Sequence, residues 1–484
     1  MVSRSSTDFQ RSLESEVSYL SANSEDSTTM VEVQGMVVKE DVYVEGDGYC
    51  IEKHIERLTV SIEEISEQRR SASPSGHLGN LTFEQQKLLI SLWGMLIEYL
   101  KRPFDEKAAK KKDRQLVSMM YEWSIETASS TTSLAESERS QISVDRSSAM
   151  QDNPLNEEFW SQAGAGDLDT LLLRFLRARK WNLNDAFQMV IDTLEWRRMY
   201  EVRKIMAEGE AGIKRELLAS GKSYFWNVDR EGRLLSIITS RLHDRYAQTL
   251  VETCRFTVYL MELGRRLMTP AETVTIIFDM ADAPLASFDL GSIQFMIQCF
   301  QSFYPESLGK CLVLNPTWLF SGFYKAVKGF LDPVVQAKIE LISDPEEIKK
   351  FVPEENLLEQ FGGTCKYRYE FVESSEAEEK GIERADRIAP LTDEQVERLE
   401  AELSDLQTRL IDTTIALNGL YAADEGSLTA ADPTLLALAD LRETLKRDIT
   451  ARRALLDANS LPKNMYHRIG VLAPDWKVSW PKVV

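Results

Sequence analysis

Residues 304–343 read YPESLGKCLVLNPTWLFSGFYKAVKGFLDPVVQAKIELIS and contain a strand–helix–strand pattern. The apolar run CLVLN at 311–315 has the length and composition of a strand. An apolar helix is predicted over 319–330, and KIELIS at 338–343 is interpreted as a second strand. Two strands joined through a helix predict parallel pairing within one sheet.

The same alternation continues upstream. Strand-like runs occupy 223–229, 234–240 and 273–280, and helices are expected near 247–268 and 287–303. Strands that alternate with helices indicate βαβ units. The predicted fold class is therefore α/β with a mostly parallel sheet.

A mainly helical region precedes the sheet, and a second one follows it. Leucines recur at helical spacing between Leu88 and Leu100, and at coiled-coil spacing within 399–410 and 438–445. The predicted domains are 1–80, mostly disordered; 81–203, a helical N-terminal lobe with a disordered insertion at 105–150; 204–372, the sheet domain; and 373–484, a linker and a C-terminal helical hairpin.

Composition argues against several classes of protein. The net charge of −20 disfavours nucleic-acid binding, which needs a basic face. The five cysteines and four histidines are scattered, so no metal site is expected. No motif for a nucleophile or for paired catalytic carboxylates occurs, so no enzymatic activity is expected. Gly221-Lys222-Ser223 resembles the end of a phosphate-binding loop, but Glu216 stands where that loop requires glycine.

Three segments in this order resemble the CRAL-TRIO family, and within it the yeast-type phosphatidylinositol transfer proteins. They are LLRFLRARKW at 172–181, YPESLGK at 304–310, and FLDP at 330–333 followed by FGG at 361–363. The resemblance covers about residues 165–370. It implies a helical lobe beside an α/β lobe, whose apolar pocket holds a lipid beneath a helical lid.

The resemblance also implies that Arg179, Glu306 and Lys338 bind the lipid headgroup. A guanidinium suits a phosphate, a carboxylate accepts hydrogen bonds from inositol hydroxyls, and an ammonium balances the phosphodiester charge. The alternatives are that Glu306 and Lys338 form only a structural ion pair, and that Arg179 pairs with acidic neighbours. Ser307 departs from the family, which often has a basic residue there.

A pocket lid and a pocket strand complete the expected site. The lid spans Trp318–Leu331, and its expected apolar face consists of Leu319, Phe320, Phe323, Val327 and Phe330. Val274, Ile276 and Phe278 share one face of their strand. In several family members, hydroxyl side chains at the positions of Val274 and Ile276 hold phosphatidylcholine. Their aliphatic replacements here predict weak phosphatidylcholine binding and room for a less polar second lipid such as a sterol. The alternative is that a neighbouring hydroxyl or a trapped water supplies the hydrogen bond instead.

The expected function is phospholipid binding and transfer without a cofactor, with phosphatidylinositol as the ligand. The chain has no long apolar run and no apolar leader, so it is expected to be cytoplasmic and to contact membranes transiently. Two alternatives remain open: a carrier of another hydrophobe such as a sterol, squalene or retinoid, and a scaffold protein. The C-terminal hairpin is expected either to pack on the domain or to bind a protein.

Overall fold

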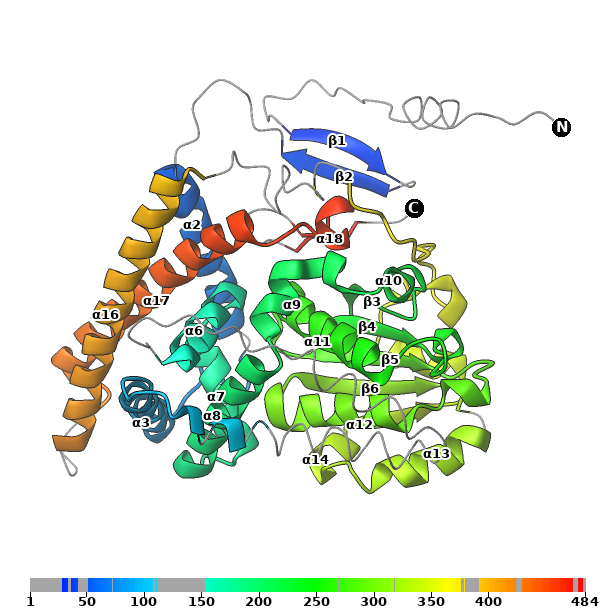
Figure 1. Ribbon diagram of the computed structural model, residues 1–484, viewed down its shortest axis with the longest axis horizontal. Helices are drawn as coiled ribbons and strands as arrows, with labels where there is room; N and C mark the ends of the chain where they lie inside the picture. The colour runs from blue at the N-terminus through cyan, green and yellow to red at the C-terminus, as the bar shows by residue number, and fades with distance from the viewer. Residues whose placement is uncertain are drawn as a thin grey trace.

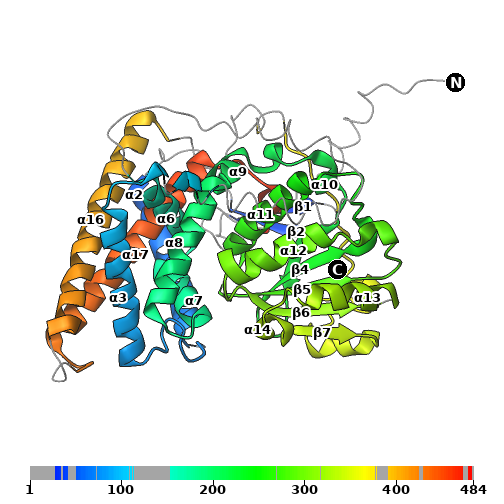
Figure 2. The ribbon, with the colours of Figure 1, turned by 60° about the horizontal axis from the view of Figure 1, so that its bottom comes forward.

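The computed structural model describes residues 28–33, 36–41, 51–71, 73–107, 109–111, 113, 153–268, 270–316, 318–375, 378, 391–423, 429–472 and 478–481. Within these residues a helical lobe lies beside an α/β lobe (Figure 1). The helical lobe lies at one side of the molecule, and the sheet with its connecting helices lies at the other (Figure 2). The predicted fold class, α/β with a helical N-terminal lobe and a C-terminal hairpin, is confirmed.

The main sheet has five strands in the order β3-β4-β5-β6-β7. Its strands are β3 (Ser223–Val228), β4 (Leu234–Thr239), β5 (Val274–Asp279), β6 (Leu308–Leu314) and β7 (Ile339–Ile342). The first pair is antiparallel and the other three pairs are parallel. A tight turn makes the antiparallel pair possible, because the Asp229 carboxylate accepts the backbone N–H groups of Glu231 and Arg233. A separate hairpin pairs β1 (Thr28–Val33) with β2 (Met36–Asp41).

Helices connect the parallel strands. They are α11 (Leu250–Leu267), α12 (Leu290–Gln298) with a π-helical turn at Cys299–Phe303, α13 (Trp318–Lys328) and α14 (Pro333–Gln336). A capping box begins α11, since Thr249 Oγ1 accepts the Glu252 N–H and the Glu252 carboxylate accepts the Thr249 N–H. The shared core of α11, α12 and the strands includes Phe256, Phe295 and Leu312.

Segments far apart in the sequence build the helical lobe. Its helices are α2 (Ile51–Ser71), α3 (Phe83–Leu100), α6 (Pro154–Trp160), α7 (Leu168–Ala178), α8 (Leu183–Met199), α16 (Asp393–Ala423) and α17 (Pro433–Ser460). They enclose one apolar core, in which Trp93 and Leu172 are fully buried. Two short helices, α9 (Val202–Glu208) and α10 (Arg215–Ala219), lead from this lobe to the sheet.

Helix α2 differs from the prediction that residues 1–80 are mostly disordered. Its Ile51 and Leu58 side chains are buried in the core of the helical lobe. Tertiary packing supplies most of the stability of a helix in a protein, and α2 packs on α17, which is distant in sequence. Residues 1–27 and 42–50, and residues 114–150 of the predicted insertion, lie outside the described residues.

A buried ion network attaches the C-terminal hairpin to the helical lobe. Arg442 and Lys446 of α17 both donate to the Asp169 carboxylate of α7, and Trp93 Nε1 donates to it at 2.7 Å. Burial alone would raise the pKa of Asp169, but the two cations hold it far below its usual range. The hairpin therefore packs on the domain, as one of the two predicted alternatives stated.

The end of the chain covers the free edge of β3. In the short helix α18 (Met465–Arg468), the Tyr466 hydroxyl accepts the Phe225 N–H at 2.6 Å and donates to the Phe225 carbonyl at 3.2 Å. An exposed strand edge can pair with other chains, and such a cover prevents that pairing.

Candidate functional site

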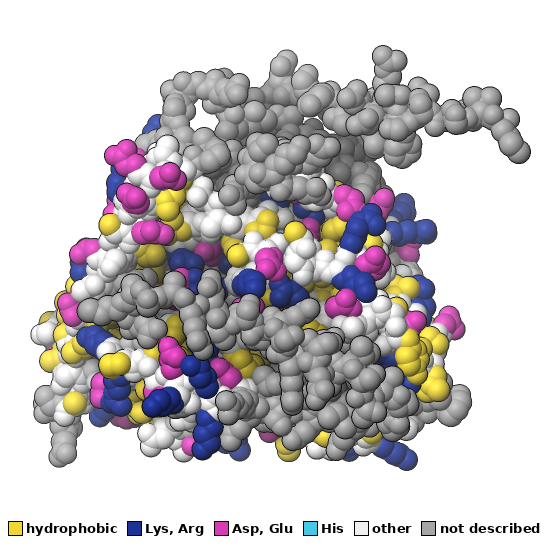
Figure 3. Space-filling model, viewed as in Figure 1, with side chains coloured by type: hydrophobic (Ala, Val, Ile, Leu, Met, Phe, Trp, Pro, Cys, Tyr) yellow, Lys and Arg dark blue, Asp and Glu magenta, His cyan; other side chains and the backbone are white. Residues whose placement is uncertain are grey.

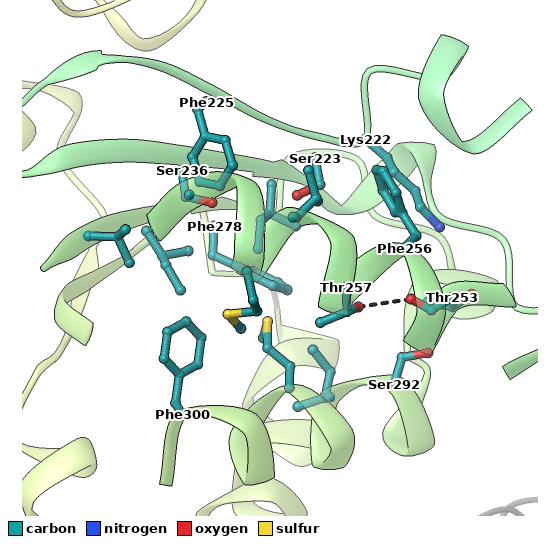
Figure 4. A pocket seen from close by; sticks show the side chains of 18 of the residues that line it. Lys222, Ser223, Phe225, Ser236, Thr253, Phe256, Thr257, Phe278, Ser292 and Phe300 are labelled. Atoms are coloured by element: carbon teal, nitrogen blue, oxygen red, sulfur yellow. Dashed lines mark hydrogen bonds between the residues drawn. The ribbon is translucent and has the colours of Figure 1, made fainter. Parts of the chain in front are cut away.

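A cavity lies between the sheet and helices α11 and α12 (Figure 4). Its volume is about 140 Å³, an order of magnitude more than the roughly 10–15 Å³ that one water molecule requires. Strands β3, β4 and β5 supply one wall and the two helices supply the other. Most of the lining is apolar, including Phe225, Phe256, Met261, Phe278, Met296 and Phe300. The cavity is therefore suited to a hydrophobic ligand.

Strand β5 presents the predicted face to this cavity. Val274, Ile276 and Phe278 all line it. Thr275 is fully buried on the other face, where its hydroxyl donates to the Asp229 carboxylate at 2.7 Å. The three β5 side chains on the cavity wall offer no hydrogen bond to a ligand.

The structure brings together two of the three predicted headgroup residues. Lys338 Nζ lies 3.9 Å from Glu306 Oε2, and both side chains are partly exposed. Glu306 and Lys338 precede the parallel strands β6 and β7, so the pair lies where both strands begin. The φ of Glu306 is 54°, a conformation that non-glycine residues seldom adopt outside tight turns and functional sites.

Arg179 is placed differently from the other two. It ends α7 with an exposed side chain, for which no hydrogen bond or ion pair occurs among the described residues.

Arg174, on the same helix, donates to the Glu306 carbonyl at 3.1 Å and to the Glu272 carbonyl at 2.6 Å. Arg174 thus positions Glu306. The sequence reasoning missed this role because the contact joins residues 132 positions apart.

Neither Glu306 nor Lys338 lines the cavity, but residues that flank Glu306 in the sequence line one end of it. Tyr304 and Ser307, on either side of Glu306, both line the cavity there. The Tyr304 hydroxyl donates to Glu262 Oε1 at 2.7 Å, and Arg197 pairs with the same carboxylate at 2.6 Å. Burial alone would raise the pKa of Glu262, but Arg197 and Arg265 lower it to about 2. A buried network of Tyr304, Glu262 and Arg197 therefore holds this end of the cavity in place.

A second polar cluster, unpredicted as a site, lies at the opposite end. Lys222 Nζ is 3.1 Å from His243 Nδ1 and 3.1 Å from Gln248 Oε1, and His243 Nε2 is 3.3 Å from Asp289 Oδ2. Burial lowers the pKa of Lys222 to about 8. In the sequence this lysine belongs only to an incomplete phosphate-loop pattern, whereas His243 and Gln248 come from the loop before α11 and Asp289 comes from the loop before α12.

The predicted lid contacts the cavity wall rather than the cavity. Phe320 is buried against Met280 and Phe288, and Val327 packs with Ile297. The Phe323 ring is partly buried, 5.2 Å from the ring of Phe288. None of the described α13 side chains lines the cavity, whereas Ile293 of α12 does and also packs in the cluster of Val327.

Phe330 lies beyond the end of α13 and is 45% exposed, so it does not join the buried face of that helix. Leu319 lies in α13, but its side chain is outside the described residues.

The surface, the helices and the possible metal ligands bear on three further expectations. On the face in Figure 3, basic and acidic side chains are interspersed and form no continuous basic patch. No helix in the described parts of the chain is long and apolar enough to cross a bilayer. Nor do three His, Cys, Asp or Glu side chains in those parts meet in a group that could hold a metal ion.

Comparison with known proteins identifies both lobes. Residues 218–363 match the model of the CRAL/TRIO domain, and residues 133–192 match that of the CRAL/TRIO N-terminal domain. The crystal structure of Sfh5 aligns with 37% of this chain and 66% of its own, at 19% identity and a TM-score of 0.33.

Three curated proteins show the extent of the similarity. A CRAL-TRIO domain-containing protein of Schizosaccharomyces pombe is 35% identical over 234 residues, which are 47% of this chain and 53% of that protein. Phosphatidylinositol transfer protein CSR1 of Eremothecium gossypii is 33% identical over 45% of this chain and 52% of its own. The chain thus spans about half the length of these two relatives. A CRAL-TRIO domain-containing protein of Saccharomyces cerevisiae is 32% identical over 40% of this chain and 71% of its own length. This chain belongs to the CRAL-TRIO family.

Proposed function

We propose that this chain binds one molecule of phosphatidylinositol and carries or presents it at membrane surfaces, as a carrier and not as an enzyme. The observation that carries the proposal is an apolar cavity, one end of which is lined by Tyr304 and Ser307, the residues that flank Glu306 of the Glu306–Lys338 pair. The cavity suits acyl chains, and the pair suits an inositol phosphodiester. A relative named as a phosphatidylinositol transfer protein supports the choice of lipid.

The energetics of acyl chains explain why a carrier needs such a cavity. Burial of each CH₂ group contributes about 0.8 kcal/mol, so two acyl chains contribute roughly 20 kcal/mol or more. A lipid with that preference for an apolar environment crosses water only when its chains are enclosed. The cavity must therefore widen to admit both chains, and α13, packed on α12, is the element we assign to that movement.

Transfer of two labelled phospholipids between vesicles tests the proposal. We expect phosphatidylinositol to be transferred roughly tenfold or more faster than phosphatidylcholine. Val274 and Ile276 give a buried choline phosphodiester no hydrogen bond, and an unpaired polar group costs about 1–3 kcal/mol, or one to two decades in affinity. The double variant Val274→Ser, Ile276→Thr restores hydroxyls to this wall and should gain phosphatidylcholine transfer. Equal rates for the two lipids in the wild type would contradict the proposal.

The aliphatic β5 wall also favours a second candidate, a carrier of a less polar lipid such as a sterol or squalene. Native mass spectrometry of the purified chain distinguishes the two, because a bound lipid adds its own mass. We expect the mass of a phosphatidylinositol, and a sterol or squalene mass alone would support the second candidate.

Membrane contact is assigned to the outer side of the α13 region. Lys325, Lys328 and Phe330 are exposed there, and cationic and apolar side chains together favour an anionic bilayer surface. Phe330→Asp should reduce co-sedimentation with anionic vesicles and leave the thermal transition unchanged, because the side chain is 45% exposed. Leu436→Asp alters an equally exposed side chain (47%) on α17 and is the matched control. Wild-type sedimentation of Phe330→Asp would show that another surface binds the membrane.

A further inference from the structure

The cavity has two separate polar ends. Tyr304 and Ser307 line it near the start of β6, beside Glu306. Lys222 lines it near the end of β4, where its carbonyl accepts the N–H of Thr239 at 2.9 Å. Lys222 and Thr253 lie together at one end in Figure 4, and Phe300 lies toward the other.

The length of α11 separates these two ends. Both Thr253 and Arg265 of this helix line the cavity, and a helix rises about 1.5 Å per residue, so they lie roughly 18 Å apart. Arg265 pairs with Glu262, the carboxylate that the Tyr304 hydroxyl contacts. A phospholipid whose headgroup binds Glu306 and Lys338 would therefore direct its chain ends toward Lys222.

The Lys222 end has hydrogen-bond donors that a hydrocarbon chain cannot satisfy. Lys222 is only 6% exposed, and His243 and Gln248 accept two of its three N–H groups. Its ammonium also lies over the Phe256 ring, 5.9 Å from the ring centroid, and no third hydrogen-bond acceptor for it occurs among the described residues. The buried Ser287 hydroxyl, which also lines the cavity, has no hydrogen-bond partner in the same set of residues. Buried donors without acceptors are costly, so a ligand with an acceptor group at this end is favoured.

The Asp289 carboxylate raises the pKa of Lys222 against the effect of burial, but it forms no ion pair with the ammonium. Asp289 is engaged at the N-terminus of α12, where it accepts from the Ser292 N–H and hydroxyl. It faces His243 rather than the ammonium. An ammonium can only donate, so His243 Nδ1 is the acceptor for Lys222, and Nε2 on the far side of the ring faces Asp289 Oδ2 at 3.3 Å. The ammonium is thus separated from Asp289 by the imidazole ring and can pair with an anionic ligand.

We infer that the Lys222 end of the cavity binds the carboxylate of a long-chain fatty acid, whose tail lies along the apolar wall toward Val274 and Phe300. The fatty acid then lies in the direction opposite to that of the proposed phospholipid. A carboxylate accepts several hydrogen bonds at once and bonds strongly to an ammonium. The inference rests on the proposed function, because both require the cavity to hold lipid.

The test compares oleic acid with oleyl alcohol, which differ only in the terminal group. Each probe displaces a fluorescent lipid from the purified full-length chain. We expect wild type to bind the acid roughly tenfold or more tightly than the alcohol, as for a charge-assisted hydrogen bond. Lys222→Met should lose that preference by weakening only the binding of the acid. Lys204→Met, which changes a lysine exposed on α9, is the matched control and should keep the preference.

The outcomes separate this inference from the proposed function. Equal affinity for the two probes in wild type, or an unchanged preference in folded Lys222→Met, overturns the inference. If Lys222→Met does not fold, the wild-type comparison decides alone. Wild type that transfers phosphatidylinositol but binds the probes equally refutes only the fatty-acid site. Wild type that prefers the acid but transfers no phosphatidylinositol refutes only the proposed phospholipid.

Discussion

Alanine at both Glu306 and Lys338 is expected to reduce phosphatidylinositol transfer between vesicles by roughly a hundredfold. Each side chain is proposed to make a charged hydrogen bond to the headgroup, and such bonds contribute about 1.5–3 kcal/mol apiece. Changing both residues leaves neither charge without its partner. The Glu306–Lys338 pair is partly exposed and its atoms are 3.9 Å apart, so its loss should hardly alter the thermal transition.

A neighbouring ion pair provides the control for this variant. Lys310 of β6 lies 3.1 Å from Glu340 of β7, and it is likewise partly exposed. Alanine at both Lys310 and Glu340 should leave transfer at the wild-type rate. Unchanged transfer by a folded Glu306→Ala, Lys338→Ala variant would mean that the pair is only structural.

Asp169→Ala is expected to lower the free energy of unfolding by about 3–5 kcal/mol, as when one partner of a buried ion pair is removed. Arg442 and Lys446, both buried, would lose the carboxylate that each contacts. Urea denaturation measures the loss, and limited proteolysis should show earlier cleavage in α16 or α17.

Because the pKa of Asp169 is lower in the folded protein, the carboxylate stabilises the fold above about pH 4. This contribution is lost as the pH falls below that value.

Two further variants separate the ion network from ordinary surface pairing. Arg70 of α2 forms an exposed ion pair with Glu443 of α17, at 2.6 Å. Arg70→Ala removes this pair and should lower the free energy of unfolding by less than about 1 kcal/mol. The triple variant Asp169→Leu, Arg442→Met, Lys446→Met replaces the network with apolar side chains and should recover much of the stability. If Asp169→Ala lowers the free energy of unfolding no more than Arg70→Ala does, the leucines of the hairpin alone attach it to the helical lobe.

Local sequence was sufficient for the strands of the main sheet, for α11, α12 and α13, and for the direction in which a strand presents its side chains, but it did not predict α2. Strand-like runs alternating with helical ones predicted the mostly parallel sheet, because each periodicity depends on residues only two to four positions apart. The same reasoning placed Val274, Ile276 and Phe278 on one face, and all three line the cavity. The hairpin helices followed from leucine spacing in the same way.

Only the tertiary structure decided which side chains meet. Arg174 reaches the Glu306 carbonyl across 132 positions, and Asp169 meets Arg442 across 273. Lys222 becomes part of a site because loops that carry His243 and Asp289 close around it. Phe330 followed the apolar pattern of α13 but lies beyond its end and is exposed. Such contacts depend on how whole elements pack, and a burial pattern along one segment carries no information about the partner segment.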